Sequence, residues 1–264
     1  MGNAAVQGEL WGQVPRDWVT IQEPHNKPLF EAMLDGASVD AGTRFLDAGC
    51  GGGGASVLAA ERGAKVSGID AAEGLLEIAR KRLPTGDFRA GDLEDLPFET
   101  ESFDAVFAAN SVQFPADRLA AVRELGRVCT PEGRIVAGLF GPPEKVALTS
   151  IFMATVKALP EPPPGAGPFA LSAPGKLEAL FEEAGLKVLE RGEVDCPYHY
   201  PDFETCWRGY LSAGPSQGAV RAIGQAKLKA AVREAVRDFQ QDDGSILIQP
   251  NVFVFVVAAH PVTR

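Results

Sequence analysis

The chain has 264 residues, of which 45% are hydrophobic and 23% are charged, a composition typical of a globular protein with a substantial buried core. Its formal net charge of −10 and its pI of about 4.9 argue against a general affinity for nucleic acid, which needs a basic surface. No stretch approaches the roughly 18 apolar residues of a membrane span, and no basic and apolar leader opens the chain. We therefore expect a cytoplasmic protein with no membrane span.

The cysteines form no C-x-x-C pair, which favours free thiols and a reducing compartment. Cys196, His199 and Cys206 are close in sequence, but their spacing fits no standard zinc pattern. We expect no metal site.

Residues 1–40 predict a helical cap packed beside a sheet, because Trp11, Trp18 and the apolar residues around Met33 have helical spacing. Pro24 and Pro28 indicate a kink within this cap. Core packing is the first expectation for Trp18 and His25, and covering the ligand loop is the alternative.

Residues 41–140 predict a regular alternation of strands and helices, which indicates a mainly parallel sheet with helices on both faces. Such sheets bind ligands at the carboxyl ends of their strands. The basic run 80–82 is expected on a solvated helix face. The expected strands are 43–46, 65–70, 88–90, 103–108 and 134–139, and the expected helices are 55–62, 73–83 and 117–128.

Residues 141–243 break this rhythm and predict an insertion and a lid. A helix to about Leu159 precedes the proline-rich stretch 160–168, which we expect to be a stiff spacer. The later elements are expected as a helix 175–184, a strand 186–193, an amphipathic helix 216–240 and one buried strand 245–258. The whole chain, 1–264, is predicted to be a single domain with a cap (1–40), a cofactor-binding core (41–140), the insertion and lid (141–243), and a last strand and tail (244–264).

A glycine-rich loop follows the first expected strand. The segment 49–54 fits G-x-G-x-x-G, whose glycines admit the pyrophosphate of a dinucleotide to a helix N-terminus. By itself this pattern leaves an NAD-dependent oxidoreductase open.

Polar residues at the ends of successive strands favour another ligand. Asp70 ends the second strand, where a carboxylate can accept hydrogen bonds from two ribose hydroxyls. Asp47, beside the glycines, is unfavourable next to a pyrophosphate but suits a ligand with an amino group and a sulfonium. Asp92 suits the exocyclic amine of adenine, and Asn110 follows the fourth strand. These residues favour an adenosyl ligand with a positive charge.

Several linked motifs resemble those of the S-adenosylmethionine-dependent methyltransferases with a Rossmann-like fold (class I), in the branch of the ubiquinone- and menaquinone-biosynthesis enzymes (methyltransferase types 11 and 25). They cover residues 43–140 and depart slightly at Glu132, where the family usually has glycine. The motifs are Asp47-Ala48-Gly49-Cys50-Gly51-Gly52-Gly53, Gly68-Ile69-Asp70, the stretch from Gly91-Asp92-Leu93 to Asp104, and the stretch from Arg127 to Arg134.

The resemblance implies an α/β three-layer sandwich whose seven-stranded sheet has the order 3-2-1-4-5-7-6, with strand 7 antiparallel. It also implies S-adenosyl-L-methionine as cofactor, with S-adenosyl-L-homocysteine as product. The residues expected to bind it are Asp47, Gly49, Cys50, Gly51, Gly53, Asp70, Ala71, Asp92, Leu93, Asn110 and, from the cap, Trp18.

Methyl transfer from a sulfonium is an in-line displacement that depends mainly on positioning. If a base assists, His199 and His25 are the candidates, since both belong to regions expected to cover the strand ends. The acceptor is expected to be an O, N or C atom of a small, apolar or aromatic metabolite, and the protein a monomer or homodimer. A non-catalytic or non-methylating S-adenosylmethionine-binding protein remains an alternative, and an NAD-dependent oxidoreductase a weaker one.

Overall fold

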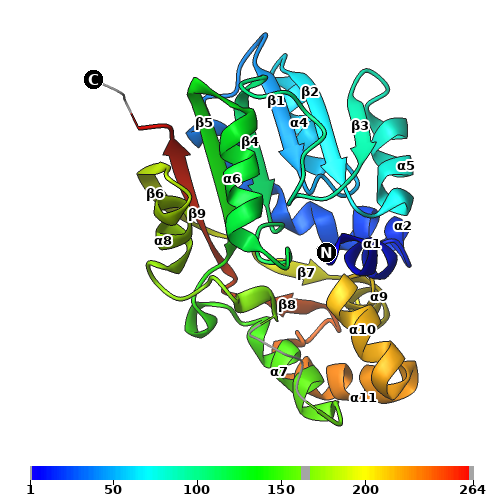
Figure 1. Cartoon of the computed structure of the whole chain (residues 1–264). Coiled ribbons are helices and arrows are strands. Elements are labelled where there is room, and N and C mark those ends of the chain that lie inside the picture. The colour runs from blue at the N-terminus through cyan, green and yellow to red at the C-terminus, as the bar shows by residue number, and fades with distance from the viewer. Residues whose placement is uncertain (1, 162–166, 262–264) are drawn as a thin grey trace.

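A seven-stranded sheet between two layers of helices forms the upper half of the molecule in the computed structural model, which describes residues 2–161 and 167–261 (Figure 1). The strand order is β3-β2-β1-β4-β5-β9-β6, with β9 antiparallel to both neighbours. This confirms the predicted order, with β9 as the seventh strand. The strands are β1 Arg44–Ala48, β2 Lys65–Asp70, β3 Asp87–Ala90, β4 Phe103–Ala109, β5 Cys129–Phe140, β6 Lys187–Asp195 and β9 Val252–Ala259.

Each face of the sheet is buried under helices, which explains why the central strands are continuous apolar runs rather than alternating ones. Phe45 and Leu46, adjacent in β1, are both fully buried in separate clusters. One cluster includes α3 Lys27–Gly36, α4 Gly54–Glu61 and α5 Glu73–Arg82. The other includes α6 Arg118–Val128 and α8 Lys176–Glu183.

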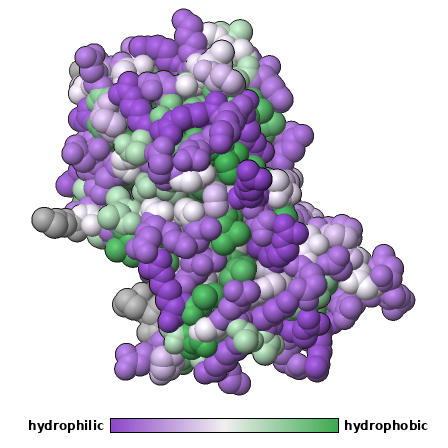
Figure 2. All heavy atoms as spheres, turned by 90° about the vertical axis from the view of Figure 1, so that its right-hand side faces the viewer, coloured by the Kyte–Doolittle hydropathy of each residue, from purple (hydrophilic) through white to green (hydrophobic). Residues whose placement is uncertain are grey.

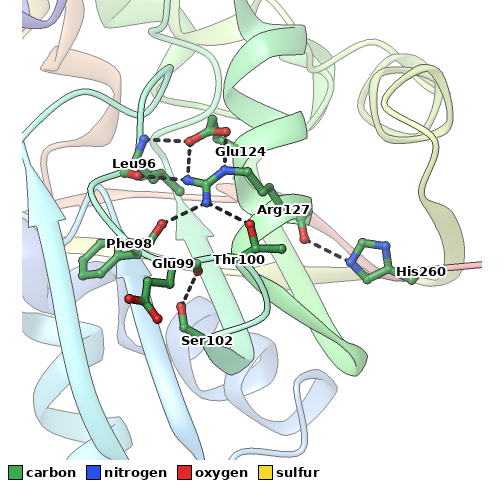
Figure 3. A network of polar contacts seen from close by, with 9 residues as sticks. Leu96, Phe98, Glu99, Thr100, Ser102, Glu124, Arg127 and His260 are labelled. Atoms are coloured by element: carbon green, nitrogen blue, oxygen red, sulfur yellow. Dashed lines mark hydrogen bonds and ion pairs between the residues drawn. The ribbon is translucent and has the colours of Figure 1, made fainter.

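A polar clasp fixes the loop after β3 to α6 (Figure 3). The guanidinium of Arg127 donates hydrogen bonds to the carbonyl oxygens of Leu96 and Phe98, each at 2.9 Å. Glu124, paired with Arg127, accepts the Leu96 N–H at 2.8 Å, and these contacts hold the pKa of Glu124 below its usual value. The clasp thereby anchors the loop that begins near Asp92.

The expected strand 245–258 is wrong as a single element. Its first part, β8 Ile246–Ile248, pairs with β7 Tyr198–Tyr200 in a separate sheet, and β9 begins only at Val252. Pro250 lies between them and has no N–H for a ladder, so strand pairing cannot run through it. Asn251 bridges the break by donating to the Ile248 carbonyl at 2.8 Å.

A helical lobe lies below the sheet, formed by the segment after β5 and the segment after β7 (Figure 1). Its helices are α7 Thr149–Ala158, α9 Phe203–Leu211, α10 Gly214–Ile223 and α11 Gln225–Ala235. The expected single helix 216–240 is wrong, because Gly224 with φ +80° separates α10 from α11. Most of the proline-rich spacer, residues 162–166, lies outside the described residues.

Residues 2–36 are mainly short helical segments, of which those before Lys27 lie at the carboxyl ends of the strands and α3 packs on one face of the sheet. They comprise α1 Ala4–Trp11, α2 Pro15–Asp17, a π-helical turn Trp18–Gln22, a 3₁₀ turn Glu23–Asn26 and α3. Across residues 2–161 and 167–261, every helix is too short or too polar to span a bilayer.

Candidate active site

A cavity opens where β1, β2 and β4 end. It collects every residue predicted to bind the cofactor except Gly53, which precedes α4 and faces Ala79 of α5. The lining includes Asn3, Gln7, Trp11, Trp18, Glu23, Asn26, Asp47, Gly49, Cys50, Gly51, Asp70, Ala71, Asp92, Leu93, Asn110, Ser111 and Phe114.

The glycine loop presents bare backbone to this cavity. Gly49 has φ +85°, and a Cβ there would lie 2.4 Å from the Cβ of Ser111, so any side chain would both strain and clash. The Gly51 N–H donates to Oδ2 of Asp70 at 2.8 Å. The end of β2 therefore holds the loop after β1.

Asp70 is a half-buried carboxylate with acceptor capacity left. Its Oδ1 accepts the Ala72 N–H at 2.8 Å, and its Oδ2 accepts the Gly51 N–H. Burial raises the pKa of Asp70, and these backbone donors oppose the rise. Since each carboxylate oxygen has a second lone pair, Asp70 can still accept hydroxyl donors from a ligand.

Asp47 is 2% exposed and accepts a hydrogen bond from Ser56 Oγ at 2.7 Å. Burial raises the pKa of Asp47 to about 7, and the negative charges of Asp70 and Glu23 add to the rise. This carboxyl group therefore titrates near neutral pH, and a nearby cation would favour its ionised form.

Glu23 brings a further acid that the sequence reading missed. It is 5% exposed and paired with Arg82, whose Nη1 also donates to the carbonyl of Gly52 at 2.9 Å. Burial raises the pKa of Glu23, and Arg82 opposes the rise. Arg82 lies on an exposed helix face as expected, but its contacts also tie the cap to the glycine loop.

Asn110 is strained and incompletely paired. It has φ +52°, an uncommon conformation for a residue other than glycine, and its N–H donates to the Gly138 carbonyl at 2.7 Å. Its buried Oδ1 has no hydrogen-bond partner among the described residues. A ligand with a positive amino group would satisfy this oxygen.

The far end of the cavity lies between Asp92 and helix α1. Asp92 Oδ1 accepts the Glu94 N–H at 3.0 Å, while Asn3 of the cap donates to the Phe114 carbonyl at 2.8 Å. Gly8 lets α1 approach closely, since a Cβ there would be 2.2 Å from the Ala71 carbonyl oxygen. Only tertiary packing brings the first residues of the chain to this site.

A second cavity adjoins the first and shares Trp11, Trp18, Asn26, Asn110 and Phe114 with it. On the face shown in Figure 2, hydrophobic side chains form a narrow band from the sheet half into the lower lobe. The remaining lining residues of the second cavity are Gln22, Gln113, Phe140, Leu148, Phe152, Pro168, Phe169, Tyr198, Tyr210, Ala213, Pro215 and Ser216. We call this the aromatic cavity.

The two histidines predicted as candidate bases lie together, but neither is in the lining of these cavities. His25 Nε2 is 3.1 Å from the carbonyl oxygen of the exposed His199, and its ring stacks on Tyr198 at 4.7 Å. Burial lowers the pKa of His25. His260 contacts the carbonyl of Gly126 at 3.0 Å (Figure 3). A catalytic role for either candidate stays a prediction without support from this placement.

The site has neither a reactive thiolate nor a metal-binding cluster among its described residues. Burial raises the pKa of the Cys50 thiol well above its usual range, so this cysteine lines the cavity as a neutral group. Within the described parts of the chain, no three His, Cys, Asp or Glu side chains gather with a geometry that could hold a metal ion.

Comparison with known proteins places the site within a recognised domain. Residues 46–137 match the family model described as a methyltransferase domain. The chain is similar to malonyl-[acyl-carrier protein] O-methyltransferase of Serratia marcescens, with 39% identity over 106 residues, 40% of this chain and 42% of that one. It is also similar to methyltransferase GfsG of Streptomyces halstedii, with 33% identity over 180 residues, 63% of this chain and 60% of that one. The chain thus spans less than two thirds of either relative.

Among solved structures, the fold is similar to that of a protein from echinomycin biosynthesis, described by the conversion of a disulfide bond into a thioacetal group. The TM-score is 0.61 at 20% sequence identity, covering 99% of this chain and 92% of that one. The predicted class I Rossmann-like fold and the resemblance to its methyltransferases are confirmed. Glycine loop, Asp47, Asp70, Asp92 and Asn110 all lie inside the matched domain.

Proposed function

Because residues 46–137 match the model of a methyltransferase domain, we propose that the chain moves a methyl group from S-adenosylmethionine to an O, N or C atom of a small, apolar or aromatic molecule. The observation that carries this proposal is the Oδ1 of Asn110, which has no partner in the described part of the chain and lies at the junction of an acid-rich cavity and an aromatic one. That oxygen needs a donor, and the surrounding carboxylates favour a cationic ligand.

The residues present fit the cofactor group by group. Asp70 offers acceptor lone pairs for the ribose hydroxyls, and Asp92 with the Leu93 amide can read the adenine. Gly49 and Asn110 would face the methionine part, whose ammonium group matches the unpartnered Asn110 Oδ1. The excess of carboxyl groups at the site also supports the positively charged S-adenosylmethionine.

When bound, S-adenosylmethionine supplies an electrophilic methyl carbon, to which the acceptor's lone pair bonds while the carbon–sulfur electron pair passes to sulfur. The chain's own task is to align the acceptor, and positioning of this kind can contribute about 7–11 kcal/mol. The aromatic cavity adjoins the cofactor cavity through Asn110 and Trp18, which supports its assignment as the acceptor site. Its apolar lining excludes water from the acceptor.

Charge also argues against NAD. The negative charges of Asp70 and Glu23 are close enough to Asp47 to raise its pKa. The nearby cation, Arg82, is already paired with Glu23. A pyrophosphate placed against the glycine loop would add negative charge to this group. Dinucleotide binding is therefore disfavoured.

Calorimetric titration with S-adenosylmethionine, S-adenosylhomocysteine and NAD tests the proposal. We expect both adenosyl ligands to bind and NAD not to bind; tight NAD binding without adenosyl binding would overturn the proposal. Asp70→Ala should weaken the adenosyl ligands about 10- to 100-fold, because it removes charged acceptors for ligand hydroxyls. Asp104→Ala is the matched control, since Asp104 pairs with Arg44 at the amino ends of β4 and β1. Screening labelled methyl transfer over a metabolite panel then separates an enzyme from a non-methylating binding protein.

A further inference from the structure

The aromatic cavity has no charged side chain among its described lining residues, although the neighbouring cofactor cavity is rich in acids. Its walls are largely aromatic: Phe140 and Phe169 lie 5.4 Å apart between ring centroids, and Phe152 lies 5.7 Å from Phe169. Burying a carboxylate, phosphate or ammonium group there would cost several kcal/mol without a partner. The cavity therefore selects against charged acceptors.

The polar groups of the lining are mostly occupied. Tyr198 donates to Asn26 Oδ1 at 3.0 Å, and Tyr210 shares a hydrogen bond with Thr155 at 2.8 Å. Burial raises the pKa of Tyr210 to about 12 and that of Tyr198 still further, so both hydroxyls stay neutral. They complete the wall rather than bind ions.

Besides Asn110, which lines both cavities, Gln113 is an exception. It is 3% exposed, lines the aromatic cavity, and has a buried Oε1 with no hydrogen-bond partner among the described residues. Arg118 Nε donates to its backbone carbonyl at 3.0 Å, which fixes the loop between β4 and α6 that carries it. Buried acceptors normally have a donor, so this oxygen indicates a donor from a ligand.

We propose that the methyl acceptor is an uncharged aromatic molecule whose hydroxyl or N–H group donates a hydrogen bond to Gln113 Oε1. The inference rests on the proposed function and names its substrate class. Asn110, which lines both cavities, leaves its own oxygen for the cofactor, so Gln113 is the group that distinguishes acceptors. Gln113 acts here as a specificity residue and not as a base, because a neutral amide does not take up a proton at neutral pH.

A matched set of naphthalene probes tests this class, measured by quenching of tryptophan fluorescence in the presence of S-adenosylhomocysteine. Trp11 and Trp18 line the aromatic cavity and report on its occupancy. The probes are 2-naphthol, naphthalene, 2-naphthoate and 2-naphthylmethylammonium, which share a ring system but differ in charge and donor. We expect 2-naphthol to bind most tightly and the two ions at least about 10-fold more weakly. Tighter binding of either ion, or binding of none of the probes, would overturn the proposal.

Gln113→Leu isolates the hydrogen bond. We expect it to weaken 2-naphthol about 2- to 10-fold, to leave naphthalene unchanged, and to leave calorimetric binding of S-adenosylhomocysteine unchanged. Gln241→Leu is the control, since Gln241 is exposed and outside both cavities. An unchanged preference for 2-naphthol over naphthalene in Gln113→Leu would refute the role of Gln113. Failure of S-adenosylhomocysteine to bind the wild-type chain would instead refute the proposed function.

Phe152→Arg provides a gain of binding that a general loss of stability cannot produce. Placing a cation on the wall of the aromatic cavity should raise the affinity for 2-naphthoate relative to 2-naphthol by about 10-fold or more, because the buried carboxylate then has a partner. An unaltered ratio would show that these probes do not occupy this cavity, and would refute the assignment.

Discussion

Replacing Asp47 by asparagine tests the central electrostatic feature of the site. The carboxyl group is 2% exposed, and asparagine keeps an oxygen to accept the hydrogen bond from Ser56. What the replacement removes is the ability to ionise. In the unfolded chain the replacement has little effect on free energy, because the carboxyl group there ionises freely in water.

The sign follows from the proton count. The pKa of Asp47 is about 7 in the folded chain against an ordinary value of 3.8, so between these values the folded state binds more protons. Stability therefore falls as pH rises from about 4 to about 7, and the loss is complete above that range. A shift of about 3 units corresponds to at most roughly 4 kcal/mol. Asp47→Asn lacks this loss and should be more stable than wild type at pH 8 by up to that amount.

Urea unfolding of the ligand-free protein at intervals from pH 4 to pH 8 measures this difference. Wild type should lose free energy of unfolding across the range, and Asp47→Asn should lose less; some slope should remain, since the pKa values of Glu23 and Asp70 are also raised. Asp104→Asn is the control and should leave the slope above pH 4 nearly unchanged, because Arg44 lowers the pKa of that exposed carboxyl group and its titration falls largely below pH 4. Parallel curves for wild type and Asp47→Asn would refute the reasoning.

Two further predictions concern the cap and the histidines. Arg82→Met should lower the free energy of unfolding by about 2 kcal/mol, because it leaves buried Glu23 without its cation. Adding Glu23→Gln should recover about half of that loss, measured by urea unfolding. A double variant no more stable than Arg82→Met would contradict this. His199→Gln should leave methyl transfer unchanged across pH, because the exposed ring lies outside both cavities. A tenfold loss of turnover would instead support the base role predicted from sequence.

The cofactor half of the site could be predicted because its signals are local. Asp70 and Asp92 each stand at or just after a strand end, and the alternation of strands with helices brings those ends to one edge of the sheet. The turn after β1 likewise needs glycine at Gly49 because of its local backbone conformation, φ +85°, although the close approach of Ser111 is a tertiary contact. The positions of these acids and of the glycine turn do not depend on how the cap and the helical lobe pack.

The sequence by itself therefore predicted the alternation of strands and helices and the edge at which the acids meet, since periodicity and turn chemistry are local signals. The strand order and the antiparallel strand followed from the family resemblance. Tertiary structure alone decided the rest: Glu23 meets Arg82 across 59 positions, and residues from Trp11 to Ser216 converge on the aromatic cavity. It also places His199 outside the lining of the aromatic cavity, although the aromatic residues beside it in sequence favoured a place at the site. A cavity exists where distant side chains fail to fill space between packed elements, and no short stretch of sequence records that geometry.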